Sequence, residues 1–524
     1  MRLKNYLIFS ILIFLSAVFN SFILSATLGR YDEGIVLVGA MRILSGEVPH
    51  RDFWSIYPPG QTFVLAGLFK FFGSSLEVER YYDLCLRIVA SCLVYVFLRN
   101  IAVSSLLGLI GWFTLTFWLS AFEFSGYPIL PALVMLLMAA NFLALYAKYR
   151  FLPYLFWGGV FIGLATLFRF DFGVVGLISY FLTLYVFQKA SHLGVGNALI
   201  SAASGAGLVA LFTFGPLVFF VGFEELITQL VLTPAAVMPK YRSLPIPEGF
   251  TALSAPFYLC PLILIFSLYL SLNRLRIRSW LAGDLAAMLR HASRKKTGAV
   301  LLFFSALGLF SLNQALVRSD MIHLLPLIFI CSILSPIILS LLLAELRAQL
   351  NPKLSRAGLF TFLLVFLMTL GYPAALKIKQ YQMKNSDPSA GGSVVISEEL
   401  SKLVDFISRN TLETDGIYVG VANHDRFTYN DVAVYFLAQR RIVTRYHELH
   451  PGVTTTPQVQ NEMVRELTAL SPKLIVLADR YVPTEQNLTS RDLGLDILDE
   501  YLRANFKKVE EFGPYQVFAP NSKS

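Results

Sequence analysis

Long apolar stretches dominate the first 376 residues of this 524-residue chain and constrain its fold more than any other feature. A helix needs about 20 mostly apolar residues to cross a bilayer, and we count roughly eleven such stretches. Only 15% of the residues are charged, whereas soluble globular proteins carry about 25%. We therefore predict a polytopic α-helical membrane protein, embedded in a lipid bilayer, with spans near 6–26, 83–99, 101–121, 128–147, 153–168, 173–187, 195–221, 257–272, 298–317, 323–343 and 357–375.

The basic residues predict how the chain lies in the membrane. Its 43 Lys and Arg against 34 Asp and Glu give a net charge of +9, which on a membrane protein collects in cytoplasmic loops rather than indicating nucleic acid. If the first span runs outward, four basic clusters share the cytoplasmic side: Lys148 with Arg150, Lys189, Arg274 to Lys296, and Arg347 to Arg356. We therefore expect a multi-pass protein of the inner (cytoplasmic) membrane whose outer, periplasmic parts are 27–82, 222–256 and everything after Tyr372.

The composition changes after residue 376 to that of a soluble domain. A polar linker around Asn385 to Ser393 leads into residues 390–524, where helical patterns alternate with short β-branched runs. Predicted helices include 397–409 and 456–470, and predicted strands include 416–421, 441–446, 473–478 and a run near 507–519. This alternation is typical of a small α/β domain, here extracytoplasmic. It contains no nucleotide-binding glycine pattern, which argues against an independent enzyme.

The first external loop, 27–82, holds the most informative residues of the chain. It reads Tyr31-Asp32-Glu33-Gly34 directly after the first span, then Gly46-x-x-Pro49-x-x-Asp52-Phe53, and then Tyr57-Pro58-Pro59-Gly60. Two adjacent carboxylates at the membrane surface suit a helix N-terminus, because acids are stabilised there. They equally suit a functional site, because placing ionisable residues near the membrane costs free energy, so such residues usually serve a function.

These three motifs together resemble the GT-C superfamily of membrane glycosyltransferases. The branch concerned contains protein O-mannosyltransferases, lipid A aminoarabinose transferases and related bacterial sugar transferases, and the resemblance covers roughly residues 1–345. It implies a catalytic transmembrane domain, 1–376, that takes a polyprenyl-phosphate-linked sugar as its donor. It also implies that Asp32, the first acid of the pair, is the catalytic base, with Glu33 as its catalytic neighbour.

The chemistry of such a transfer agrees with a carboxylate at the membrane surface. A base must take the proton from an acceptor hydroxyl while that oxygen attacks the anomeric carbon, and direct displacement inverts the configuration there. Cations must stabilise the departing phosphate. The sugar is left open, hexose or pentose, and so is the acceptor, which is an envelope glycan, a lipid or a protein.

The sequence departs from the family pattern at one position that concerns metal binding. In aminoarabinose transferases a glutamate associated with metal stands two residues before the Pro-Pro pair, where this chain has Ile56. A divalent cation is therefore undecided, with Asp52 and Glu123 as candidate ligands, and no other cofactor is indicated.

Two short external turns carry candidates for binding the donor phosphate. Arg169 lies in Arg169-Phe170-Asp171, while Arg318 and His323 lie in the segment from Arg318 to His323. An arginine presents a fork of donors that suits a phosphate. The alternative is that each Arg-Asp pair, with Asp171 or Asp320, is only a structural ion pair, and that His323 is a packing residue.

Other residues are candidates for contacting the sugar or the lipid. Glu123 occupies the second external loop, and an amphipathic loop, 223–256, offers its basic residues to the phosphate. The full set of substrate-binding candidates is Glu123, Asp52, Tyr57, Lys240 and Arg242. In the outer domain, His447, Glu448 and His450 have the wrong spacing for a HExxH zinc helix, so we expect them to dock on the membrane part or to contact the acceptor.

Other functions are compatible with many membrane spans. A lipid or polysaccharide transporter or flippase would also contain buried Arg and Asp residues, although near mid-bilayer and in repeated halves, which we do not find. A non-catalytic sensor would not need the dense first-loop motif. Within the enzyme class, a polysaccharide polymerase or ligase is a further alternative.

Overall fold

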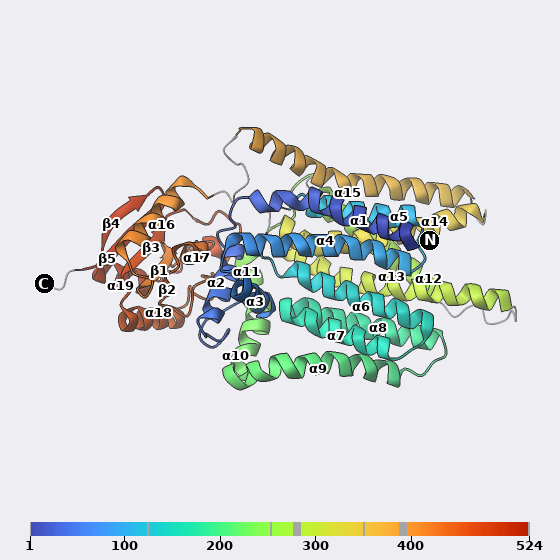
Figure 1. Cartoon of the computed structure of the whole chain (residues 1–524), viewed down its shortest axis with the longest axis horizontal. Coiled ribbons are helices and arrows are strands. Elements are labelled where there is room, and N and C mark those ends of the chain that lie inside the picture. Colours follow the sequence, from blue (N-terminus) through green and yellow to red (C-terminus); the bar gives the residue numbers. More distant parts are fainter. Residues whose placement is uncertain are drawn as a thin grey trace.

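A bundle of long helices forms most of the molecule, and a small sheet domain caps one end of it (Figure 1). The N-terminus lies at the end of the bundle far from the sheet. The computed structural model describes residues 2–122, 125–251, 254–275, 285–348, 352–386, 396–480 and 482–521. The predicted linker around Asn385 to Ser393 falls almost entirely outside these ranges, as does Glu123.

Nine apolar segments of the described chain are long and apolar enough to cross a membrane. All nine coincide with spans predicted from the sequence. Helices are the expected form, because a membrane offers the backbone no other hydrogen-bond partners. They are α1 (Arg2–Asn20) with the short η1 (Ser21–Ser25), α4 (Leu76–Asn100), α6 (Ile129–Tyr149), α8 (Phe170–Ala190), α9 (Gly196–Val221), α12 (Ala255–Leu275), α13 (Leu285–Val317), α14 (Met321–Arg347) and α15 (Pro352–Ser386).

Three further apolar helices are shorter: α3 (Gly60–Phe72), α5 (Ser105–Leu119) and α7 (Pro153–Phe168). We predicted full spans over 101–121 and 153–168, but α5 has 15 residues and α7 has 16. At 1.5 Å per residue these helices are only about 23 Å long, less than the roughly 30 Å of a hydrocarbon core. The predicted count of about eleven spans is therefore not confirmed.

Four short helices lie between the bundle and the sheet: α2 (Asp32–Leu44), α10 (Phe223–Ile227), the π-helical η2 (Thr228–Val237) and α11 (Met238–Arg242) (Figure 1). The segment predicted as a loop, 223–256, is thus helical as far as Arg242. Beyond Arg242, the amide of Leu244 donates to the Val317 carbonyl at 3.0 Å, and the Leu244 carbonyl accepts from the Ser319 amide at 3.2 Å. We call residues 238–245 the strap, because they bind the chain to the turn between α13 and α14.

The sheet domain has five strands in the order β2-β1-β3-β5-β4. β1 is parallel to β2 and β3, whereas β5 is antiparallel to β3 and β4. The strands are β1 (Gly416–Val421), β2 (Arg441–Ile442), β3 (Leu474–Ala478), β4 (Phe506–Phe512) and β5 (Tyr515–Pro520). The helices are α16 (Glu398–Asn410), α17 (Ala433–Ala438), α18 (Pro457–Leu470), the short η3 (Leu488–Ser490) and α19 (Ile497–Asn505).

Helices cover both faces of this sheet, which explains the continuous apolar runs of its central strands. Successive side chains of a strand point to opposite faces, so Ile417 packs with α16 and α17 while Tyr418 packs with α18 and α19. The prediction of a small C-terminal α/β unit is confirmed.

The sheet domain and the helices α2 and α3 share one hydrophobic cluster, which is separate from the core of the helix bundle. Buried residues of α2 and α3 belong to the same cluster as those of α16 and α17. Gly34 makes this contact possible, because a Cβ added there would lie 2.6 Å from the Ala433 amide nitrogen. The amide of Ala433 also donates to the Arg30 carbonyl at 2.9 Å. The glycine of the Tyr31-Asp32-Glu33-Gly34 motif is therefore needed for docking the C-terminal domain.

Candidate active site

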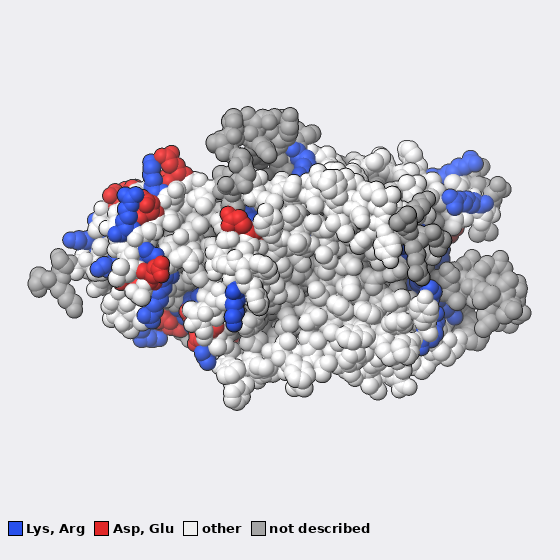
Figure 2. All heavy atoms as spheres, in the orientation of Figure 1, with Lys and Arg blue, Asp and Glu red and all other residues white. Residues whose placement is uncertain are grey.

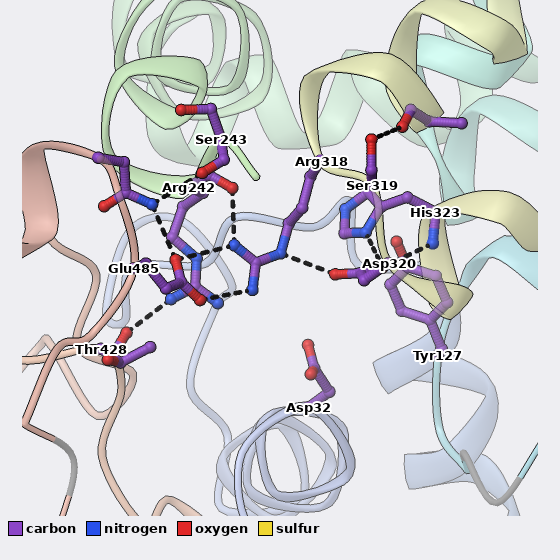
Figure 3. A network of polar contacts seen from close by, with 12 residues as sticks. Asp32, Tyr127, Arg242, Ser243, Arg318, Ser319, Asp320, His323, Thr428 and Glu485 are labelled. Carbon is purple, nitrogen blue, oxygen red and sulfur yellow. Dashed lines mark hydrogen bonds and ion pairs between the residues drawn. The ribbon is translucent and has the colours of Figure 1, made fainter. Parts of the chain in front are cut away.

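Asp32 is the first residue of α2 and is half-buried. Its carboxylate points toward the turn between α13 and α14 (Figure 3), and the Tyr57 hydroxyl donates to its Oδ1 at 3.5 Å. Burial raises the pKa of this carboxyl, and the positive charges of Arg242, His450 and His323 oppose the shift. A carboxylate with a raised pKa is a stronger base than one in water.

Glu33 faces different surroundings, although it is the next residue. The side chains of Glu33 and Arg80 are each 1% exposed, and the guanidinium donates to both carboxylate oxygens at 2.6 and 2.7 Å. The Gly29 amide adds a third hydrogen bond at 2.7 Å, and Glu79 lies 3.6 Å from the same guanidinium. Glu33 is thus held inside a closed ion network, away from the space that Asp32 faces.

The turn between α13 and α14 carries a chain of three polar residues (Figure 3). Arg318 Nε donates to Asp320 Oδ2 at 2.8 Å, and Asp320 Oδ1 lies 2.6 Å from His323 Nδ1. Asp320 also caps α14 by accepting from the His323 amide. Burial acts to raise the pKa of Asp320, but the hydrogen bonds and charges of His323 and Arg318 outweigh it and lower the pKa. The structural ion pair considered from the sequence is therefore present, and His323 stays partly exposed.

The rest of the Arg318 fork holds a carboxylate from the sheet domain. Its two terminal nitrogens lie 3.1 and 2.9 Å from the Glu485 oxygens, and one of them also donates to the Arg242 carbonyl at 2.6 Å (Figure 3). Asn487 donates to Glu485 at 2.8 Å and to the Ser243 carbonyl at 2.9 Å. One anion from the C-terminal domain thus occupies the geometry that suits a phosphate.

The strap presents its two basic residues differently. Arg242 is partly buried and donates to the Thr428 carbonyl at 2.7 Å, so its charge is fixed near Asp32. Lys240 is exposed. Of this pair, only Arg242 belongs to the surroundings of the Asp32 carboxylate.

Arg169 and two tyrosines form another side of the site. Arg169 is buried and donates to both Asp171 oxygens, at 3.0 and 2.6 Å, and to the Tyr127 hydroxyl at 2.9 Å. Its guanidinium lies 5.9 Å from the Tyr57 ring, which packs edge-on against Tyr127. Arg169 therefore supports the aromatic residue that contacts Asp32.

Asp52 does not face this group. Its carboxylate binds Arg51 and accepts from the Val48 amide at 2.7 Å, which closes the local turn of the Gly46-x-x-Pro49-x-x-Asp52-Phe53 motif. In the described part of the chain, no three His, Cys, Asp or Glu residues are grouped so that they could hold a metal ion. The other metal candidate, Glu123, lies outside the described residues.

The structure adds residues that the sequence did not indicate. Glu485, Arg80 and Tyr127 contact predicted site residues from far along the chain or from another helix. No spacing in the sequence connects Glu485 with Arg318, which are 167 residues apart. The only available signal was chemical: unpaired arginines near a membrane surface require anionic partners.

Comparison with solved structures identifies the fold. Two crystal structures of ArnT from Cupriavidus metallidurans, one bound to undecaprenyl phosphate and one in the apo state, each match with a TM-score of 0.55 and 15% identity. Each match covers 99% of this chain and 98% of the ArnT chain. No family model and no curated protein sequence matches. ArnT is a lipid A aminoarabinose transferase with the GT-C fold, so the predicted GT-C fold is confirmed, and the likeness includes the sheet domain.

Proposed function

We propose that this protein is a membrane glycosyltransferase that moves a sugar from a polyprenyl-phosphate donor to a hydroxyl group of an envelope glycan, lipid or protein. One observation carries this proposal: at one end of an apolar helix bundle, Asp32 faces an arginine fork that already binds an anion (Figure 3). The fold shared with a transferase that binds undecaprenyl phosphate supports it.

Asp32 is the proposed general base. It accepts the proton of the acceptor hydroxyl while that oxygen forms a bond to the anomeric carbon. The bond from this carbon to the phosphate oxygen breaks, and the electron pair leaves with the polyprenyl phosphate. The raised pKa of Asp32 favours this proton transfer, and direct displacement inverts the anomeric configuration.

Arg318 is the proposed main contact for the donor phosphate. A carboxylate and a phosphate use the same paired hydrogen bonds to a guanidinium, so the Glu485 carboxylate marks an anion subsite. Donor binding then requires Glu485 to yield its place. We propose that His323 and Arg242 add positive charge there, and that Arg169 keeps Tyr57 against Asp32.

The position of the site in the molecule agrees with a lipid donor. On the face shown in Figure 2, an uncharged band separates the sheet end, where acidic and basic residues mix, from the opposite end, where basic residues predominate. Basic residues favour the cytoplasmic side. We infer that the site and the sheet domain lie on the periplasmic side of the inner membrane, where a polyprenyl chain in the bilayer meets a water-side acceptor.

Comparison of envelopes with and without the protein tests this function. Mass spectrometry of extracted lipids and glycans should show loss of one sugar from one acceptor when the protein is absent, and its return with the wild-type chain. Unchanged sugar attachment together with altered sidedness of a lipid would instead favour a transporter.

A further inference from the structure

The C-terminal domain binds the residues that lead directly into Asp32. Beside the backbone hydrogen bond from Ala433 to Arg30, the Arg30 guanidinium donates to the Tyr515 hydroxyl at 2.8 Å. The hydroxyl of Tyr31 donates to the Leu449 carbonyl at 3.1 Å. The start of α2 is therefore fixed by the sheet domain as well as by the helix bundle.

A buried acid–histidine pair of the same domain, Glu448 and His450, makes a hydrogen bond to the Tyr31 hydroxyl. His450 Nε2 lies 2.9 Å from Glu448 Oε2 and 2.9 Å from the Tyr31 hydroxyl oxygen. The side chain of Glu448 is 0% exposed and that of His450 is 6% exposed. The imidazole packs against the Trp54 ring at 5.0 Å and the Tyr31 ring at 5.6 Å. Both of these aromatic rings belong to the first external loop, 27–82.

Such a pair contributes little to stability, because removing two charges from water costs about as much as their attraction returns. Glu448 Oε1 is also buried and has no hydrogen-bond partner among the described residues. The pair nevertheless reaches the residue next to the proposed base. Its position therefore points to a role in the site rather than in folding.

We propose that Glu448 and His450 are positioning residues for Asp32: through Tyr31 they fix the first turn of α2, and they hold the His450 imidazole near the carboxylate. This inference rests on the proposed function. It makes the C-terminal domain part of the active site rather than an appended module.

The electrostatics of the neighbouring groups agree with this role. Burial, followed by the Glu448 charge, raises the pKa of Tyr31 far above its ordinary value, so its hydroxyl keeps its proton and donates. A protonated His450 lowers the pKa of Asp32, as do Arg242 and His323. Other titratable groups also lie close to these two residues: Tyr57 and Asp320 are near Asp32, and His447 is near His450.

The sign of the pH effect follows from these charges. Asp32 must be ionised to accept a proton, so the rate rises as the pH passes upward through its pKa. Without the Glu448 carboxylate, the His450 imidazole loses the hydrogen bond that holds it near Asp32, and with it Asp32 loses a charge that lowers its pKa. The acid limb of the pH–rate profile then moves to higher pH.

The test compares Glu448→Gln and Tyr31→Phe with a matched control in the same domain. His424 and Asp499 form an equally buried pair, with Nδ1 and Oδ1 2.6 Å apart and side chains 2% and 8% exposed. Asp499→Asn therefore removes a similar charge without touching α2. Each full-length variant, in detergent, is given synthetic undecaprenyl-phosphate hexoses and pentoses together with an envelope extract that supplies the hydroxyl acceptor. Release of undecaprenyl phosphate is then measured with the sugar that the wild type transfers fastest.

Glu448→Gln should lower kcat by up to about 100-fold, as expected for a misplaced catalytic group, with the donor KM unchanged. Its acid limb should move to higher pH, and Asp499→Asn should not show this movement. Tyr31→Phe should lower kcat with unchanged KM, and it decides the question if Glu448→Gln does not fold. Equal pH profiles for Glu448→Gln and Asp499→Asn, or an unaltered kcat in Tyr31→Phe, would overturn the inference. A wild type that releases no undecaprenyl phosphate would instead refute the proposed function.

Discussion

Two clusters of acids and arginines lie at the same end of this molecule, and they differ in how completely they are closed. In the first, Glu33, Arg80 and Glu79 are at most 1% exposed and satisfy one another. In the second, Arg318 and Glu485 keep 15% and 16% of their side-chain surface, and Glu485 belongs to another domain. The same residue types therefore form a fully buried ion network in one place and, in the other, a partly exposed ion pair between two domains, which we propose to be the donor-phosphate site.

This difference separates two adjacent residues of one motif. Asp32 and Glu33 follow each other in the chain, but the α-helix turns successive side chains by about 100°, so each reaches a different cluster. Asp32 faces the open cluster, and Glu33 completes the closed one. Adjacency in the sequence does not imply a shared role.

Breaking the closed cluster should have the largest effect on stability. Arg80→Met leaves the carboxylates of Glu33 and Glu79 buried without a cation, which should cost about 3–5 kcal/mol of unfolding free energy. The control is Arg51→Met, whose pair with Asp52 is 46% and 31% exposed, so that solvent screens it and its loss should cost far less. Unfolding of both variants in detergent compares their free energies of unfolding. Equal losses of unfolding free energy in Arg80→Met and Arg51→Met would show that the first cluster is not a structural network.

Weakening the open cluster should affect donor binding instead. Arg318→Lys keeps the charge but loses the paired hydrogen bonds, worth about 1.5–3 kcal/mol, so affinity for undecaprenyl phosphate should fall roughly 10- to 100-fold. Lys240→Gln should have a smaller effect, because Lys240 is exposed on the strap. Binding of undecaprenyl phosphate to the purified variants is the measurement. An affinity for Arg318→Lys equal to that of the wild type would exclude Arg318 as the phosphate contact.

The smallest effect should have the opposite sign. Glu485→Gln removes the negative charge that competes for Arg318, so affinity for undecaprenyl phosphate should rise, by roughly 2- to 5-fold for a partly exposed pair. The same binding assay measures it. A fall in affinity would mean that Glu485 supports the site rather than occupying it.

Most of the fold followed from patterns that lie within single segments. Apolar length placed the nine long spans, and alternation of short β-branched runs with helices placed the elements of the sheet domain. Two further apolar stretches were also predicted as spans, but α5 is shorter than the predicted 101–121, and α7, which coincides with the predicted 153–168, has only 16 residues. Hydropathy cannot distinguish burial in lipid from burial in protein.

The site was only partly predictable, because its contacts join distant segments. The first-loop motif and the short turns indicated Asp32, Arg318, His323 and Arg169 as candidates. The sequence could not reveal that Glu485 binds the Arg318 guanidinium, since a loop of the C-terminal domain makes that contact by folding back on the strap. Nor could it show that Asp52 closes a local turn, because its carboxylate could equally have faced the site.

Single-turnover transfer by Asp32→Asn tests the central claim most directly. The substitution is nearly isosteric and leaves the Arg318 cluster intact, so binding of undecaprenyl phosphate should be kept. Loss of the general base should lower the rate of transfer by about 10²- to 10⁴-fold, whereas Asp52→Asn should remain within a few-fold of wild type. Transfer from the undecaprenyl-phosphate sugar at a near-wild-type rate by folded Asp32→Asn would contradict the assignment of Asp32 as the base.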